Sequence, residues 1–340
     1  MNNDDYKNIQ FKDIEEGLVV NKGKSTPYIL DNEELKRLSV DYKALVVELE
    51  SLDKEKEFDK MLMLREKLNE LKRKLWTGIP LELDKLKNEI TRDIYLYLEK
   101  FGYSRDFVIG NLEDLELYVS DVDIIAEGKI VTVGNKIGID SEFVDFDRKG
   151  NIIGIKDYYK LFLKYTLTHE FLHKLSSNRK DKPAVPVLED ALIEGSTDMY
   201  AHLISENDLD KSNLYDFLVK VCIILRRIVG NKEFLQDYID NLPNWTNTRK
   251  VFSECGLNDD DFSNLYFGMN KVLAYTRSGM DPEGLNKLKE EIIVFIKNRL
   301  IRNRYTKKRE LREMEKVFNI LFNTELKEIV LNKTTSNLVK

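Results

Sequence analysis

Two of the three histidines in the chain, His169 and His173, stand four residues apart, and Glu170 directly follows the first of them. Residues four apart in an α-helix lie on one face, so both imidazole rings can bind one zinc ion at about 2.0–2.1 Å. The side chain of Glu170 points roughly 100° away around the helix, where it can act as a general base without binding the metal. The spacing therefore predicts a catalytic zinc site.

The residues around this motif are expected to form a buried central helix. The segment Asp157–Leu175 has neither Gly nor Pro, is apolar on nearly all sides and begins with Asp, which is a favourable N-cap residue. Two alternatives stay open for the histidine pair. The rings are core side chains that are satisfied by hydrogen bonds, or they bind a metal that takes no part in catalysis.

A catalytic zinc site needs a third protein ligand, and a second predicted helix, Val187–Glu206, offers one. Its polar side chains recur every four residues and form one stripe along the helix. Glu194 is the best candidate, because it follows His173 at a distance that lets one helix end and the next cross it. Gly195 supports this, since glycine is tolerated in a helix where two backbones come close. The stripe consists of Asp190, Glu194, Asp198 and His202.

Two residues of the stripe are candidates for supporting the ligands. Asp198 is expected to accept the ring N–H of His169 or His173 and so to fix its tautomer. His202, one turn later, is interpreted as a second supporting or structural residue. The alternative is that the whole stripe is a solvated helix face, which is the usual reason for such a pattern.

The motif from His169 to His173, followed by Glu194-Gly-Ser-Thr-Asp198, resembles the gluzincin branch of zinc metallopeptidases. The thermolysin-like enzymes and the aminopeptidases with a Glu-Gly motif show this arrangement. The resemblance implies a Zn²⁺ cofactor held by the two histidines and Glu194, with Glu170 as the base and Asp198 as the orienting residue. It covers only the region of the two predicted helices.

The chain differs from the better-known zinc peptidases in its histidine content. No histidine or glycine lies between Lys174 and Arg179, which argues against the metzincin type. No histidine follows His202, whereas thermolysin-like enzymes use a later one to stabilise the oxyanion. The candidates for that role are tyrosine and arginine side chains, for which a core or surface role is the alternative. They are Tyr275, Arg277 and Tyr200.

Upstream of the histidine motif, short runs rich in Val, Ile and Tyr are separated by glycines between residues 112 and 156. They predict a small sheet of three or more strands. The expected fold class is therefore α+β, with a zincin-like core of a small mixed sheet plus the active-site helix. In zincins an edge strand pairs with the substrate backbone, and residues 136–144 or 151–156 are the candidates for that edge.

The remaining segments are expected to be mostly helical. We expect an N-terminal segment that is partly disordered (1–30), a helical arm or hairpin (31–77), the zincin core (78–206) and a helical C-terminal subdomain (207–340). The apolar spacing of the arm lapses midway, which fits either a hairpin or one long helix with a register break. The arm packs within the molecule or forms a dimerising coiled coil, and it is a candidate surface for a protein partner.

Charge and composition limit the partners and the cellular location that we expect for the protein. The net charge of −6 argues against a nucleic-acid partner, and the basic run 297–316 is interpreted as a charge-paired helix face. Cys222 and Cys255 are expected to be free buried thiols. Because no signal pattern and no long apolar run is present, we expect a cytoplasmic protein that does not associate with a membrane, although export without a signal stays open.

The sequence predicts a zinc-dependent metallopeptidase that hydrolyses peptide bonds in a peptide or protein substrate. Zinc and Glu170 would together activate the attacking water. The alternative is a binding or regulatory protein with the zincin fold, or a toxin-like effector without a signal sequence, that has little or no general protease activity.

Overall fold

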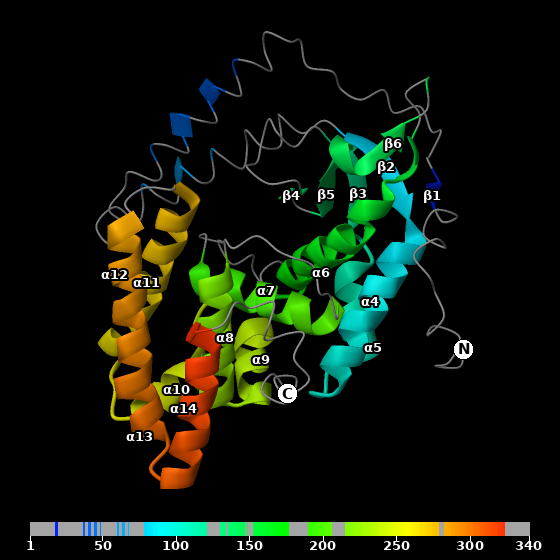
Figure 1. Cartoon of the computed structure of the whole chain (residues 1–340). Coiled ribbons are helices and arrows are strands. Elements are labelled where there is room, and N and C mark those ends of the chain that lie inside the picture. Colours follow the sequence, from blue (N-terminus) through cyan, green and yellow to red (C-terminus); the bar gives the residue numbers. More distant parts are fainter. Residues whose placement is uncertain are drawn as a thin grey trace. The chain divides into compact units, whose positions relative to one another are not determined.

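The structure is a computed structural model of the chain (Figure 1). It describes residues 18–19, scattered positions between 37 and 67, and residues 78–120, 130–133, 135–146, 148, 152–176, 190–205, 215–278 and 282–323. Within these residues, none of the helices has the length and apolar character needed to cross a membrane. The chain divides into two compact units, residues 1–95 with 105–170 and residues 96–104 with 171–340.

The first unit contains a mixed five-stranded sheet with the order β1-β2-β3-β5-β4. Strands β3 and β5 are parallel, and the other neighbouring pairs are antiparallel. The sheet together with the many helices confirms the predicted α+β class. The strands are β1 (Leu18–Val19), β2 (Gly78–Leu83), β3 (Glu116–Ser120), β4 (Ile130–Val133) and β5 (Lys136–Asp140).

Strand β5 lies inside the sheet, between β3 and β4. Leu117 of β3 pairs with Ile137, and Val119 pairs with Ile139, and all four side chains are buried. Because β5 has hydrogen-bonded neighbours on both sides, residues 136–140 cannot be the edge expected for them. The edge of the described sheet on this side is β4.

A separate hairpin follows the sheet in the chain. After the 3₁₀ turn η2 (Ser141–Phe143), β6 (Val144–Phe146) pairs antiparallel with β7 (Ile152–Ile155), with an irregularity in register at the end of β6. Residues 152–155, the other candidate edge, therefore pair only with β6 among the described strands.

Helices α4 (Asp84–Glu99) and α6 (Lys160–Ser176) begin in the first unit and cross the division between the units. The expected start of α6 at Asp157 is wrong, because residues 157–159 form a 3₁₀ turn, η3, before the α-helix begins. Asp157 instead forms an ion pair of 2.6 Å with Lys160. The short α5 (Arg105–Leu112) lies between α4 and β3 in the sequence.

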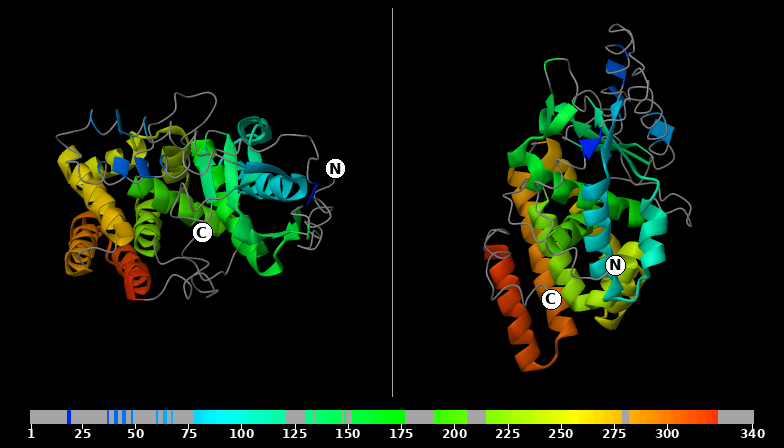
Figure 2. Two further views of the ribbon diagram at one scale, coloured as in Figure 1. Left: turned by 90° about the horizontal axis from the view of Figure 1, so that it is seen from above. Right: turned by 90° about the vertical axis from the view of Figure 1, so that its right-hand side faces the viewer.

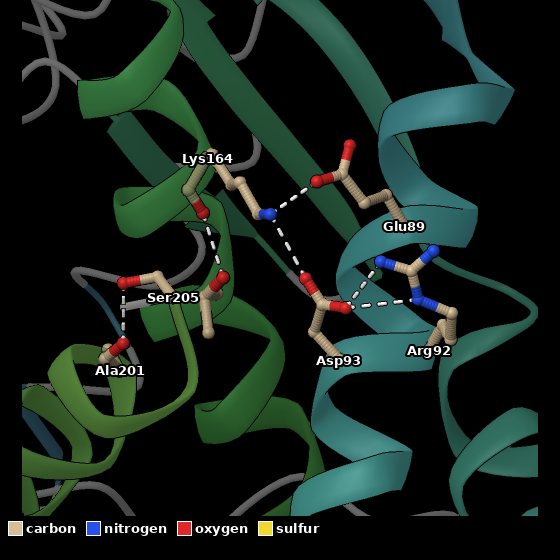
Figure 3. Close-up of polar contacts among 7 residues, drawn as sticks. Glu89, Arg92, Asp93, Lys164, Ala201 and Ser205 are labelled. Atoms are coloured by element: carbon tan, nitrogen blue, oxygen red, sulfur yellow. Dashed lines mark hydrogen bonds and ion pairs between the residues drawn. The ribbon is translucent and has the colours of Figure 1, made fainter. Parts of the chain in front are cut away.

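A group of charged side chains ties α4 to the first part of α6 (Figure 3). Lys164 of α6 extends between Glu89 and Asp93 of α4, and its amine contacts both carboxylates. The guanidinium of Arg92 binds the same Asp93 at 2.7 Å. These side chains are mostly buried, and the paired acids raise the pKa of Lys164 even though desolvation opposes the charged amine. The group fixes α6 on the side of the helix away from His169 and His173.

The second unit is helical in its described residues. Helix α7 packs against α8 and α11, and α11 packs against α12. Figures 1 and 2 show α14 lying along the end of the α12 helix, which continues through the π-helical turn η4. The helices are α7 (Ala191–Ser205), α8 (Asp216–Val229), α9 (Asn231–Asp240), α10 (Thr246–Glu254), α11 (Asp259–Ser278), α12 (Pro282–Phe295), η4 (Ile296–Ile301), α13 (Arg302–Arg304) and α14 (Lys308–Asn323).

The compact units differ from the segments expected from the sequence. Helix α7, expected in the sheet-containing core, groups with α8 and α11, so no division falls at residues 206 and 207. Segment 1–30 and most of 31–77 lie outside the described residues, and the described positions between 37 and 67 are helical. Among these, Lys60 and Glu48 form an ion pair of 3.2 Å. The choice between a hairpin and one long helix concerns residues outside the described ones and stays a prediction.

The basic run near the C-terminus carries several ion pairs. Lys307 lies 3.3 Å from Glu310, and Arg309 lies 3.2 Å from Glu313. Arg304 binds Glu254 of α10 at 2.6 Å. These contacts support the interpretation of the run as a charge-paired face. The two cysteines of the chain are free and buried, as expected.

Candidate metal centre

The three residues expected to bind a metal come together in the structure. A ring nitrogen of His169, a ring nitrogen of His173 and a carboxylate oxygen of Glu194 all lie within 4.8 Å of one another. Nε2 of His173 is 3.5 Å from Oε2 of Glu194. In a tetrahedral zinc site with bonds of about 2.1 Å, two ligand atoms are about 3.4 Å apart. Two imidazoles and one carboxylate that converge in this way could hold a metal ion, and the His173–Glu194 distance is close to that between two zinc ligands.

Helix α6 carries the two histidines and Glu170. The helix is continuous across the motif, so the four-residue spacing places both imidazoles on one face as predicted. His169 is buried, whereas Glu170 and His173 are partly exposed. A base that handles protons from water needs such access, and the exposure of Glu170 provides it.

The first turn of α7 carries Glu194, and a network of hydrogen bonds holds this turn. The carboxylate of Asp190 accepts hydrogen bonds from the backbone N–H groups of Leu192 at 2.9 Å and Ile193 at 3.2 Å, as an N-cap does. Burial raises the pKa of Asp190 to about 6. The backbone N–H of Glu194 donates to the carbonyl of Asp190 at 2.8 Å, which begins the helical hydrogen bonding.

Gly195 brings α7 into close contact with α8. A Cβ atom at this position would lie 2.9 Å from Sγ of Cys222, 3.0 Å from Cβ of Leu218 and 3.1 Å from the backbone of Leu218. The hydroxyl of Ser196 also reaches Sγ of Cys222, at 3.6 Å. The expected close approach of two backbones at Gly195 is therefore present, and the partner helix is α8.

The polar stripe of α7 is buried, so it is not the solvated face that was the alternative. Glu194 is 9% exposed and Asp198 is 7% exposed. Oδ2 of Asp198 lies 3.8 Å from Nε2 of His202, which places His202 beside the residue expected to orient a ligand. The hydrogen bond expected from His169 or His173 to Asp198 stays a prediction. A buried carboxylate is stable only where hydrogen-bond or ionic partners surround it, so the groups that meet this stripe determine what each of its acids can do.

Tyr200 is wrong as a candidate for oxyanion stabilisation. Its side chain is completely buried among aromatic rings of the second unit, with the ring of Tyr238 at 5.3 Å and the ring of Tyr97 at 5.9 Å. Six residues after Glu194, it points to another side of α7. Burial raises the pKa of Tyr200 far above its ordinary value, so the hydroxyl belongs to the core.

The other two oxyanion candidates, Tyr275 and Arg277, lie near the end of α11. Tyr275 is partly buried and follows Tyr266 by nine residues, which is about 180° around the helix. It therefore points away from the side of α11 on which Tyr266 contacts Asp190. The side chain of Arg277 lies outside the described residues, so its role stays a prediction.

Two residues near the candidate centre were not expected from the sequence. Tyr266 donates its hydroxyl proton to Oδ2 of Asp190, and Oδ1 of Asn270 accepts the backbone N–H of Ala191 at 2.8 Å. These partners are 76 and 79 residues apart in the chain. No local pattern in the sequence predicts contacts at such a separation.

Comparisons of the chain with protein-family models, with curated proteins and with solved structures give no significant match. The chemistry of the site is therefore argued from its own side chains. The residues that carry it are two imidazoles, a converging carboxylate and a second carboxylate, Glu170, adjacent to the first histidine in the sequence.

Proposed function

We propose that the chain is a zinc-dependent metallopeptidase of the gluzincin kind. His169, His173 and Glu194 would hold the ion, and Glu170 would act as the general base. The observation that carries the proposal is the convergence of the three ligand atoms within 4.8 Å on the two helices named from the sequence. Glu194 is far from the histidines in the chain, and only the folded structure brings it to them.

The residues of the site have the properties that peptide hydrolysis requires. A bound zinc ion would polarise the scissile carbonyl and lower the pKa of a water molecule to about 7. Glu170 accepts the proton of the attacking water and delivers it to the nitrogen of the leaving amine, so the carboxylate is restored when the peptide bond has broken. With Tyr200 buried elsewhere, Arg277 and Tyr275 are the remaining candidates for stabilising the oxyanion.

The sheet supports the zincin part of the proposal. A mixed sheet precedes the helix with the histidine motif, and the described sheet ends at β4, which is antiparallel to its neighbour. Such an edge has unpaired backbone groups that can bind an extended peptide. We therefore assign the substrate-binding edge to β4 instead of residues 136–144.

A second function is favoured by one observation. Tyr200 lies in the core, so fewer groups are left that could stabilise an oxyanion. Of the two other candidates, Tyr275 is partly buried, and the side chain of Arg277 lies outside the described residues. A protein with the zincin fold that binds zinc and recognises a peptide without cleaving it would need no such group. This binding or regulatory role predicts zinc without proteolysis.

The experiment that tests the proposal combines metal analysis with a cleavage screen. The full-length protein is purified without added chelator and its zinc content is measured by elemental analysis. We expect about one zinc per chain for the wild type and for Glu170→Gln, because the base does not bind the metal. A proteome-wide search for new chain termini is then expected to find cleavages made by the wild type and none made by Glu170→Gln.

Each possible result has a defined meaning. A zinc content below about a tenth of an ion per chain would contradict the metal site. Cleavage by Glu170→Gln at the wild-type rate would remove Glu170 as the base. Zinc bound at full content with no cleavage by the wild type would favour the binding role over the peptidase.

A further inference from the structure

Helix α11 contacts the first turn of α7, the turn that carries Glu194. The first N–H groups of any helix lack partners inside the helix, so this turn frays first unless other groups hold it. In α7, the N–H of Ala191 binds Asn270, and those of Leu192 and Ile193 bind the carboxylate of Asp190. All three of these N–H groups therefore have partners.

The cap itself is attached to α11. Oδ1 of Asp190 accepts both N–H groups, while its other oxygen, Oδ2, accepts the hydroxyl of Tyr266. Asp190 is 3% exposed, so no layer of solvent replaces these bonds when one is removed. The ring of Tyr266 is stacked on Phe262 at 6.2 Å, and Phe262 packs edge-on against Phe252 of α10 at 5.3 Å. The donor is thus held by two further aromatic side chains.

We propose that Tyr266 and Asn270 are positioning residues for the third metal ligand. They fix the first turn of α7 from α11, and through this turn they fix the carboxylate of Glu194 near the two imidazoles. This inference rests on the proposed metal site and extends it to residues that touch neither the ion nor a ligand side chain. A preorganised ligand loses less conformational freedom when it binds, so its metal affinity is higher.

The test uses the full-length chain and the metal ion alone. Tyr266→Phe removes the hydroxyl and keeps the ring, and Asn270→Ala removes the acceptor of the Ala191 N–H. Zinc affinity is measured by competition with a chromophoric chelator, and the absorption spectrum of the Co²⁺-loaded protein reports the coordination. We expect each substitution to weaken zinc binding by a few-fold to about 10-fold, which is less than the 10-fold to 100-fold loss caused by removing a partner bonded directly to a ligand. The Co²⁺ spectrum is expected to change with it.

Tyr238→Phe is the matched control. The hydroxyl of Tyr238 is also buried and also bonds to α7, but at Thr197, at 2.7 Å and beyond the first turn. We expect this variant to unfold at a lower urea concentration, as the other two do, and to keep the wild-type zinc affinity and Co²⁺ spectrum. If these side chains contributed to stability alone, the zinc affinities of all three variants would change by the same amount.

A second control asks whether Tyr266 acts through Glu194. In a Glu194→Ala background, Tyr266→Phe is expected to leave the residual zinc affinity unchanged, because the positioned carboxylate is gone. The inference is overturned if Tyr266→Phe and Asn270→Ala bind zinc as tightly as the wild type, or if Tyr238→Phe weakens binding equally. Failure of the wild type itself to bind zinc is a different result, which overturns the proposed function and this inference with it.

Discussion

Three acidic residues of the same stripe on α7 have different surroundings. Asp190 caps the helix and contacts α11, Glu194 lies beside His173, and Asp198 lies beside His202. None of the three residues is more than 9% exposed, so each carboxylate depends on specific partners. Spacing alone indicates that these residues share a face, but the role of each follows from the helix that it meets.

The buried carboxyl of Asp190 is expected to make the stability of the metal-free protein depend on pH. Burial raises its pKa from 3.8 to about 6, although the Tyr266 hydroxyl and two backbone N–H groups favour the charged form. The folded state then binds the proton more tightly than the unfolded chain. The stabilisation is full below about pH 4 and is lost as the pH rises through 6. The difference between the two pKa values corresponds to about 3 kcal/mol in the free energy of unfolding.

Asp190→Asn tests this prediction, because asparagine is also a good N-cap and does not titrate. The free energy of unfolding is measured in urea for both proteins, without metal, from pH 4 to pH 7. We expect the wild type to lose stability relative to Asp190→Asn across this interval. Parallel curves for the two proteins would contradict the raised pKa.

At the scale of elements, the contact between α7 and α8 depends on Gly195. Alanine at this position would bring a Cβ atom to 3.1 Å from the backbone of Leu218, which cannot move without shifting α8. Alanine normally stabilises a helix interior by about 1 kcal/mol over glycine. Overpacking costs about 1–3 kcal/mol, and we expect it to prevail at this rigid contact, so that Gly195→Ala lowers the free energy of unfolding.

Gly268 of α11 provides the matched control for this prediction. A Cβ atom there would meet only the side chains of Ile292 and Leu288, at 3.5 Å and 4.0 Å, which are ordinary contacts. Gly268→Ala is therefore expected to raise the free energy of unfolding, measured in the same urea experiment. Stabilisation by both substitutions would show that α8 shifts to accommodate a Cβ atom at position 195.

The elements that the sequence predicts well are those in which the pattern is local. The helical character expected for 207–340 corresponds to the helices from α8 to α14, and the histidine spacing indicates α6. The contact of α11 with the cap of α7 and the position of β5 inside the sheet were not predicted. Both depend on partners that are not neighbours in the sequence, as the 76 residues between Asp190 and Tyr266 illustrate. Tyr200 was misjudged for the same reason, since its aromatic neighbours come from α4 and α9.

For the whole molecule, the candidate ligands lie on two helices, so a bound ion would stabilise both helices against unfolding. Zinc that binds only the folded chain adds about 2.7 kcal/mol to the free energy of unfolding at a free concentration 100 times its Kd. We expect this increment for the wild type in urea unfolding with and without Zn²⁺. His173→Ala, which removes one ligand, is expected to show little of it at the same zinc concentration. Protons compete for the imidazoles, so the increment is expected to shrink as the pH falls. Mg²⁺, which prefers oxygen ligands, serves as the control ion, and an equal increment from it or with His173→Ala would show that the stabilisation comes from elsewhere.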